Sequence, residues 1–298
     1  MPILDRIIDK KMAAALPARF DGDPRLRYPD PVSFGVSCTS FAFESTARLV
    51  GGRYFVPGKK QKALVAFFHG MGGGRCAYSK LIAALAEQGY LVYAFDYAGC
   101  MQSQGIVACS IMQPLVDQEA FFRFLDQDPP AAGLPRYAIG HSWGGNAALC
   151  ALRPSYGVAK VVSIAGWAHS SRFGGKKAPM LRGYLARRYG DLGKLDGLQL
   201  MKQTDKKVLC LSGSEDRIVD VDENFHRFES ELSGKPNIEF CLVPGRAHQP
   251  FWTQDAQDYF LEIIDAIDKT DQGVPIDYDR LMQLDPLVMK RIFDFLAA

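Results

Sequence analysis

Short apolar runs alternate with longer helical patterns from about residue 60 onward. The runs are rich in β-branched and aromatic residues and lie at 63–68, 91–95, 137–139, 161–164, 208–211 and 238–243. Nearly every position in them is apolar, which is typical of parallel strands that helices cover on both faces. Upstream, residues 34–39 and 46–55 predict an antiparallel pair of strands at the edge of the sheet. The pattern therefore predicts an α/β fold with a mostly parallel central sheet flanked by helices.

Two of the segments between these strands have apolar residues at helical spacing. They are residues 79–88 and residues 115–125, and the second is rich in phenylalanine. Residues that break helices follow both segments, at Gly89 and at Pro129. We expect both segments to be helices that connect neighbouring strands.

Three further segments interrupt or extend the alternation. Residues 167–206 are basic and partly amphipathic, and we expect them to form a short helical lid inserted into the domain. Residues 1–30 predict an N-terminal helical extension, because their apolar stretch is too short and their start too acidic for a signal peptide. Residues 274–298 contain an amphipathic pattern that predicts a C-terminal helix docked on the main body. We expect residues 1–298 to form one domain with these additions.

Composition narrows the classes of function. The formal net charge is +2, from 35 basic and 33 acidic side chains, which is too balanced to favour nucleic acid as a partner. Seven cysteines, several within apolar runs and none in a CxxC pair, favour a reducing compartment. No apolar run approaches the roughly 18 residues of a membrane-spanning helix. The sequence therefore predicts a soluble, cytoplasmic protein without an integral membrane segment.

The pentapeptide from Gly140 to Gly144 has the form GxSxG, with Ser142 at its centre. It follows an apolar strand and precedes a helix start of small residues, which is the context of a nucleophile elbow. Glycines two positions from the serine let strand and helix approach closely. The alternative is a glycine-rich turn whose serine only caps a helix. The position within a βα series favours Ser142 as a nucleophile.

A glycine-rich loop follows the strand at 63–68 and reads His69-Gly70-Met71-Gly72-Gly73-Gly74. Flexible backbone there can turn an N–H group toward a substrate carbonyl oxygen. We assign the oxyanion hole to the backbone N–H groups of Met71 and Trp143. Phosphate binding is the alternative, but the loop has neither a GxxxxGK[ST] nor a GxGxxG pattern. Asp96, at the end of the next strand, precedes the nucleophile and is expected to be architectural.

A nucleophile elbow is followed along the chain by an acid and then by a histidine. After the strand at 208–211, Asp216 lies just past a glycine turn and ahead of an apolar pair, so we choose it as the acid. After the strand at 238–243, His248 can accept the Ser142 proton while Asp216 fixes its tautomer. The other acids considered are Glu215, Asp220 and Asp222, and the other histidines are His69, His141, His169 and His226.

Taken together, these motifs resemble the α/β-hydrolase superfamily, within it the branch of monoacylglycerol lipases, esterases and serine aminopeptidases. The resemblance covers roughly residues 50–265 and also includes Tyr78, Asp96, Gly99, Ser103 and Gly105. It implies an acyl-enzyme mechanism that needs no cofactor or metal. The chain departs from the branch at Ala98, at Cys100–Met101, in its short lid and in its long ends. These departures affect the substrate class, because the lid shapes the acyl or alcohol pocket.

The leading functional prediction is a serine hydrolase that cleaves a carboxylic ester, in the manner of a carboxylesterase or lipase. Its expected partner is a small-molecule acyl ester. A thioesterase, amidase or aminopeptidase would use the same triad. A non-catalytic binding protein with this fold is the alternative from another class. The basic residues of 167–206 leave open a peripheral contact with an anionic membrane, against a simply solvated face. The sequence does not indicate an oligomeric state.

Overall fold

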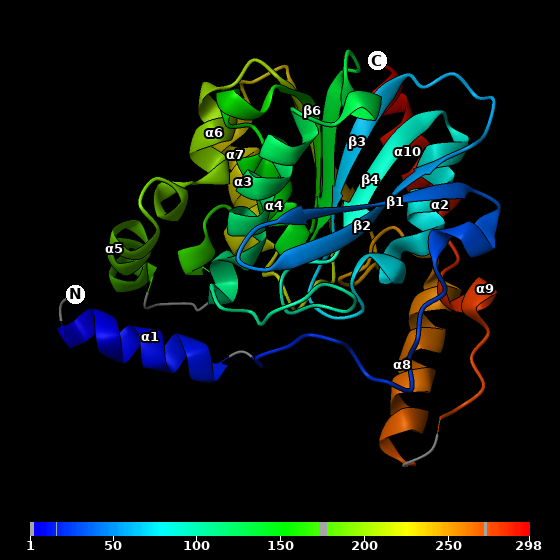
Figure 1. Cartoon of the computed structure of the whole chain (residues 1–298), viewed down its shortest axis with the longest axis horizontal. Helices are drawn as coiled ribbons and strands as arrows, with labels where there is room; N and C mark the ends of the chain where they lie inside the picture. The colour runs from blue at the N-terminus through cyan, green and yellow to red at the C-terminus, as the bar shows by residue number, and fades with distance from the viewer. Residues whose placement is uncertain (1–2, 16, 173–177, 271–272) are drawn as a thin grey trace.

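The structure is a computed structural model that describes residues 3–15, 17–172, 178–270 and 273–298. It contains an eight-stranded sheet with the strand order β1-β2-β4-β3-β5-β6-β7-β8 (Figure 1). The strands are β1 Ser37–Glu44, β2 Arg48–Phe55, β3 Ala63–Phe68, β4 Tyr90–Phe95, β5 Arg136–His141, β6 Val158–Ile164, β7 Lys207–Gly213 and β8 Ile238–Val243. β1 and β2 are antiparallel to their neighbours, and the six strands β3 to β8 are mutually parallel. The predicted α/β class with a mostly parallel sheet is confirmed.

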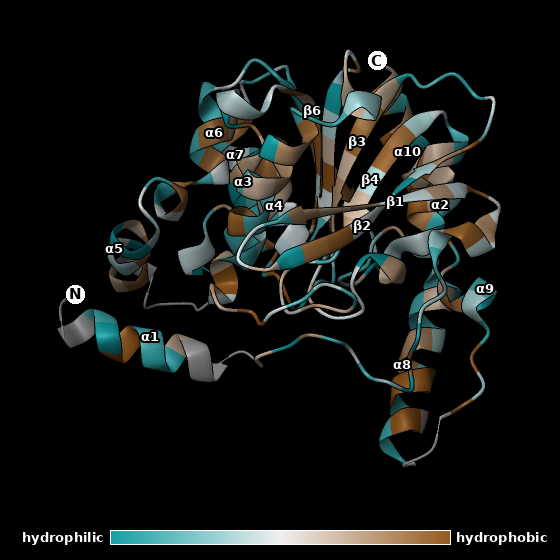
Figure 2. Cartoon of the chain, in the orientation of Figure 1, coloured by the Kyte–Doolittle hydropathy of each residue, from teal (hydrophilic) through white to brown (hydrophobic). Residues whose placement is uncertain are grey.

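Helices cover both faces of the sheet (Figure 1). They are α1 Ile3–Ala15, α2 Ser79–Glu87, α3 Gln113–Leu125, α4 Trp143–Cys150, α5 Ala178–Tyr189, α6 Gly197–Gln203, α7 Arg227–Leu232, α8 Gln254–Asp268, α9 Tyr278–Leu281 and α10 Pro286–Ala297. Residues from α3, α4 and α6 share one buried cluster with the sheet, and residues from α2, α8 and α10 share the other. All six positions of β3 and of β4 are buried, which explains why these strands lack polar alternation (Figure 2).

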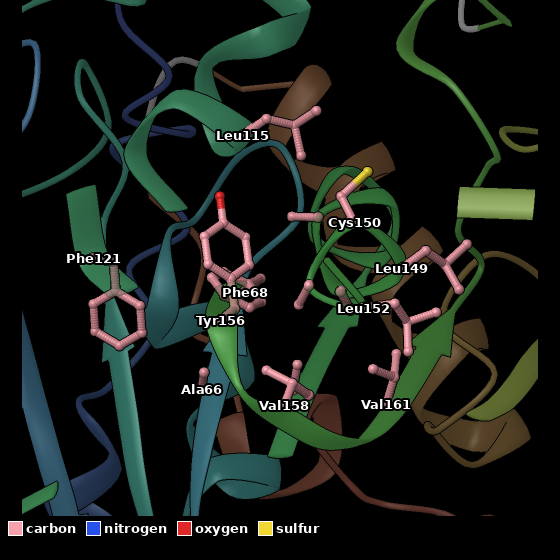
Figure 3. Close-up of a cluster of buried hydrophobic side chains, with 14 of the residues drawn as sticks. Ala66, Phe68, Leu115, Phe121, Leu149, Cys150, Leu152, Tyr156, Val158 and Val161 are labelled. Atoms are coloured by element: carbon pink, nitrogen blue, oxygen red, sulfur yellow. The ribbon is translucent and has the colours of Figure 1, made fainter. Parts of the chain in front are cut away.

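The first face is packed by large aromatic and aliphatic side chains. Phe68 on β3 lies 6.2 Å from Phe121 on α3, ring centre to ring centre. Tyr156 stacks on Phe122 with a centroid distance of 4.2 Å. Figure 3 shows this cluster between α4 and the strands β3 and β6. Burial on this scale fixes α4, and with it the residue just before α4, against the sheet.

One predicted strand is displaced in the structure. We expected the first strand at 34–39, but Pro31–Phe34 forms a 3₁₀ turn and β1 begins at Ser37. The turn starts there because the Asp30 side chain accepts a hydrogen bond from the Val32 N–H, and Pro31 fixes the backbone for a turn. Phe34 therefore belongs to the turn, whereas residues 37–39 are in β1, which pairs antiparallel with β2 as predicted.

The additions to the sheet are helical. α1 lies within the expected N-terminal extension, and α5 and α6 lie within the expected lid at 167–206, of which residues 173–177 are outside the described residues. α10 contributes Ile292 and Phe295 to the second buried cluster. No helix among the described residues is long and apolar enough to cross a membrane.

A buried carboxylate on α3 ties two loops to the first face. Asp117 accepts hydrogen bonds from Ser45 Oγ at 2.6 Å, Gln113 Nε2 at 3.0 Å and the Ala98 N–H at 2.8 Å. Burial raises the pKa of Asp117 to about 6, although these three donors oppose the shift. Because all three partners donate, the site is built for a group that only accepts.

We predict that Asp117→Asn destabilises the protein by about 1–3 kcal/mol at neutral pH, because its amide leaves at least one buried donor unpaired. Urea unfolding measures the change. Asp268→Asn, on an exposed carboxylate at the end of α8, is the control and should change the free energy of unfolding by less than about 0.5 kcal/mol. Equal stability of the wild type and Asp117→Asn would contradict this account of the cluster.

Candidate active site

Ser142 stands alone between β5, which ends at His141, and α4, which begins at Trp143. Its backbone has φ 58° and ψ −115°, in a region that residues with a side chain rarely adopt. Such strain persists only where the surrounding structure enforces it, and it is concentrated at functional sites. The conformation presents the serine at the carboxyl edge of the parallel strands.

Close backbone contacts enforce this turn. A Cβ atom at Gly140 would lie 2.0 Å from the carbonyl oxygen of Gly144. A Cβ atom at Gly144 would lie 1.9 Å from the carbonyl oxygen of Phe68 on β3. Real Cβ atoms do not approach other atoms so closely, so only glycine fits at either position. The two glycines of the pentapeptide are thus a steric requirement of the strand-to-helix turn.

The predicted acid and base are in direct contact. His248 Nδ1 lies 2.8 Å from Asp216 Oδ2, and the Asp216 side chain is completely buried. The other oxygen of Asp216 accepts hydrogen bonds from the backbone N–H groups of Ile218 and Val219 at 2.8 and 3.0 Å. Burial raises the pKa of Asp216, but the hydrogen bond and charge of His248 and the two backbone donors outweigh it and lower the pKa below its ordinary value. An ionised Asp216 requires His248 to carry its proton on Nδ1, which leaves Nε2 free to accept one.

The structure brings His248 next to the turn that carries Ser142. The ring centres of His141 and His248 are 4.6 Å apart, and His141 directly precedes Ser142. The Ser142 hydroxyl has no hydrogen-bond partner in the part of the chain that the structure describes. Catalytic hydrogen bonds in unliganded sites are often long and tighten only around substrate.

The loop 69–74 after β3, here called the oxyanion loop, is fixed by a neutral histidine. Burial lowers the pKa of His69. Its Nε2 accepts a hydrogen bond from the Tyr97 N–H at 3.1 Å, so Nδ1 carries the proton and donates to the Gly70 carbonyl at 2.6 Å. All peptide bonds in the described chain are trans, so the Met71 N–H points away from the Gly70 carbonyl of the same peptide unit.

Neither assigned oxyanion donor has a partner in the described part of the chain. Among the described residues, no group accepts a hydrogen bond from the Met71 N–H or from the Trp143 N–H. A Cβ atom built on Gly70 would lie 3.3 Å from Ser142 Cβ, so the oxyanion loop lies directly against Ser142. The Trp143 N–H belongs to the first turn of α4, where the helix dipole favours negative charge. Two free donors next to Ser142 have the character of an oxyanion hole.

A second neutral histidine joins three loops. The Gly70 N–H donates to Tyr78 Oη at 3.0 Å, and Tyr78 Oη lies 2.8 Å from His141 Nδ1. His141 Nε2 lies 2.6 Å from the His248 carbonyl, which can only accept, so Nε2 carries the proton and Tyr78 donates to Nδ1. Burial, followed by repulsion from His248, lowers the pKa of His141 to about 3. The chain of hydrogen bonds has one consistent arrangement of protons and links the oxyanion loop to the backbone of His248.

Asp96 supports the oxyanion loop through an arginine that the sequence reasoning missed. Asp96 Oδ2 is hydrogen bonded to Arg75 Nη1, and Asp96 Oδ1 accepts from the Arg75 N–H at 2.8 Å. Burial alone would lower the pKa of Arg75, but the charge of Asp96 raises it above its ordinary value. Arg75 also donates to Tyr54 Oη and Gln102 Oε1, at 3.1 and 2.9 Å. The signal in the sequence is a lone arginine directly after three glycines.

The other candidate residues lie elsewhere. Glu215, Asp220 and Asp222 are exposed on the loop and turn after β7. His226 is exposed, and His169 is buried, where it contacts Ser171 Oγ and the Gly193 carbonyl. No cluster of three or more potential metal ligands occurs among the residues that the structure describes.

The basic side chains of α5 have acidic partners. Arg187 pairs with Asp5 of α1 at 2.6 Å, and Arg182 pairs with Asp196 at 3.0 Å. Arg188 lies 3.5 Å from Asp9, also on α1. These pairs partly neutralise the basic face that suggested contact with an anionic membrane.

Residues 59–189 match the family model described as serine aminopeptidase, S33. The match includes the oxyanion loop and the elbow and ends before Asp216 and His248. A comparison with the curated proteins finds no match.

Solved structures have the same fold at low sequence identity. An esterase from Pyrococcus furiosus is 19% identical with a TM-score of 0.60, over 83% of this chain and 97% of that one. The protein TT1662 from Thermus thermophilus is 18% identical with a TM-score of 0.56, over 72% and 91%. The esterase domain of a Rhodothermus marinus protein is 17% identical with a TM-score of 0.54, over 78% and 98%. The chain has the α/β-hydrolase fold, as the sequence motifs predicted.

We predict that Gly144→Ala destabilises the protein by about 3 kcal/mol or more, because the new methyl group would overlap the Phe68 carbonyl and force the backbone apart. Thermal and urea unfolding measure the loss. Gly234→Ala is the matched control, since a Cβ atom there meets no atom within 4 Å. Equal stability of the two variants would show that the elbow is not sterically closed.

We predict that His141→Phe costs about 1–3 kcal/mol, because it leaves the Tyr78 hydroxyl and the His248 carbonyl without their buried partner. His141→Gln keeps one donor and one acceptor and should lose less. The wild type should also lose stability as pH falls below the ordinary histidine value of 6.5 toward about 3, because the unfolded chain binds a proton that folded His141 does not. Both variants should lack this contribution when unfolding is measured across that pH range. An unchanged pH dependence would contradict a neutral, buried His141.

Proposed function

We propose that this protein is a serine hydrolase that cleaves a carboxylic ester, with Ser142 as nucleophile, His248 as base and Asp216 as the acid that orients it. The observation that carries the proposal is the 2.8 Å contact between His248 Nδ1 and a fully buried Asp216 carboxylate, beside a serine in strained backbone. Fold similarity alone would not support a function, since one fold serves many activities. The argument therefore rests on the chemistry of these three groups.

The proton arrangement is suited to nucleophilic attack. Because Asp216 accepts the Nδ1 proton, Nε2 of His248 can take the proton of Ser142 Oγ as the oxygen attacks the ester carbonyl. The Met71 and Trp143 N–H groups would hold the resulting oxyanion. His248 then returns the proton to the departing alkoxide, which leaves an acyl group on Ser142. A water molecule, activated by His248 in the same way, releases the acid and restores the serine. No step requires a cofactor.

Ester cleavage is favoured over aminopeptidase activity, although the matching family model carries the latter description. An aminopeptidase must hold the ammonium group of its substrate, for which a carboxylate is the usual partner. Asp96 and Asp216 are already engaged by Arg75 and His248, and Asp23, near the oxyanion loop, is paired with Arg25 at 2.7 Å. Thioester or amide cleavage through the same triad is the second candidate.

All seven cysteines are free thiols. Their state supports a reducing, cytoplasmic location as part of the proposal.

We predict that a fluorophosphonate probe labels the wild-type protein and fails to label Ser142→Ala. Ser230→Ala, on an exposed serine of α7, is the control and should be labelled like the wild type. A panel of p-nitrophenyl esters, thioesters and aminoacyl anilides then separates the reaction classes, with esters expected to react fastest. Labelling of Ser142→Ala would overturn the nucleophile. Absence of labelling and of turnover in a folded wild type would favour a non-catalytic binding protein.

A further inference from the structure

A cavity of about 240 Å³ lies beside the proposed active site. Its walls come from four parts of the chain: residues 22–28, the oxyanion loop and η2 (Arg75–Tyr78), the loop after His248, and α8. None of its described lining residues belongs to the expected lid at 167–206. Figure 1 shows how the blue chain after α1 runs across the molecule to α8, which brings these parts together.

Residues 17–30, here called the N-terminal segment, are anchored on the loops of the site. The Phe20 N–H donates to the Gly99 carbonyl at 2.8 Å, and the Phe20 ring packs on Trp143 at a centroid distance of 5.9 Å. The Arg19 guanidinium donates to the carbonyls of Met101 and Gly105, at 2.9 and 2.8 Å. These contacts hold the N-terminal segment as a fixed part of the site.

The segment also approaches the oxyanion loop and α8 directly. A Cβ atom on Gly22 would lie 3.2 Å from the Gly73 nitrogen, and one on Gly73 would lie 3.1 Å from the Tyr28 ring. At the far end, Arg25 donates to the Ile267 carbonyl at 2.9 Å. The N-terminal segment therefore closes the cavity on one side, and contacts at both of its ends hold it in place.

Two lining residues connect the cavity to the reacting groups. Met71, whose N–H is the assigned oxyanion donor, contributes to its wall. Gln249, which follows His248, contributes to the same wall, and its side-chain amide has no hydrogen-bond partner within the described chain. A group bound in the cavity would thus extend between the oxyanion loop and the loop that carries the base.

The lining indicates a neutral, apolar occupant. Leu26, Phe260 and Ile264 face it with Trp252 and Phe251, and Asp23 is its one carboxylate among the described lining residues. Hydrogen bonds from Arg25 pair that carboxylate, so it adds no free charge. An apolar cavity of about 150 Å³ holds benzene, so by proportion this one holds roughly nine or ten carbon atoms.

We propose that this cavity receives the apolar part of the ester substrate, a chain or ring of medium size, and that Leu26 and Ile264 limit its length. The inference rests on the proposed esterase function and adds the substrate class. It assigns substrate selection to the N-terminal segment and α8. The apolar part is either the acyl chain or the alcohol of the ester, and both have the same chemistry.

The test is a chain-length profile of kcat/KM. p-Nitrophenyl esters with acyl chains of about two to twelve carbons examine the acyl side, and alkyl acetates over the same range examine the alcohol side. Leu26→Trp and Ile264→Trp fill the cavity and should lower kcat/KM for chains of about eight carbons at least tenfold, with the two-carbon esters changed less than about twofold. Leu26→Ala enlarges the cavity and should move the optimum to longer chains. If the chain-length profile changes in the p-nitrophenyl series, the cavity binds the acyl chain; if it changes in the alkyl acetate series, the cavity binds the alcohol.

Leu261→Trp is the matched control, because Leu261 lies on the same helix as Ile264 but is 66% exposed and does not line the cavity. Its profile should equal that of the wild type. If both filling variants fold and leave both series unchanged, the cavity does not select substrate and the inference is wrong, while the proposed esterase function stands.

A binding measurement distinguishes a failure of the cavity inference from a failure of the proposed esterase function. Calorimetric titration with 2-nonanone, a neutral ketone of medium length that needs no turnover, should show binding to the wild type and at least about tenfold weaker binding to Leu26→Trp. Binding of this kind in a protein that hydrolyses no ester would reject the esterase function and retain the cavity as a ligand site. Absence of binding together with unchanged profiles would reject the inference.

Discussion

The rest of the site depends on one steric constraint, the contact of three backbones at the elbow. Gly144 lies against the Phe68 carbonyl of β3, and Gly140 lies against Gly144. These contacts are possible only without side chains, and they hold Ser142 at a positive φ that it would not adopt in a free loop. They also bring β3 next to α4, so the loop that follows β3 must pass beside the serine. The position of the oxyanion loop is therefore a consequence of the elbow.

Polar contacts then fix the loops that the elbow brings together. His69 and His141 are both buried and neutral, and each holds one proton between a donor and an acceptor. Neutral rings suit this task, because they can bridge loops without the cost of burying a charge. Arg75 and Asp96 add an ion pair beneath the same loop. Taken singly, these are ordinary buried interactions, but together they hold near Ser142 two N–H groups that have no partner among the described residues.

Much of this arrangement could be predicted from the sequence because it lies at strand ends. Continuous apolar runs reveal buried parallel strands, and the residues that follow them must meet at one edge of the sheet. That logic predicted Ser142, Asp216 and His248 as nucleophile, acid and base, and the structure places the last two in contact at 2.8 Å. It failed at a turn that a single side chain caps, and at an ion pair between residues on two different loops. Phe34, predicted as the start of a strand, ends the capped turn at Pro31–Phe34. Arg75 pairs with Asp96 because β4 ends beside it, 21 positions along the chain.

The N-terminal segment shows why the proposed substrate pocket is harder to predict than the candidate catalytic groups. Residues 17–30 lack the periodicity of a strand or helix, and they precede the segment 59–189 that matches a known family. Their contacts with Gly73, Trp143 and α8 join residues that are far apart in the sequence, by 242 positions for Arg25 and Ile267, and a sequence pattern records none of them. Catalytic groups must keep a fixed geometry and so follow the rules of the sheet, whereas a pocket wall needs only an apolar surface that any segment can supply. An irregular extension can therefore change what the site accepts without altering the elbow that defines its reaction.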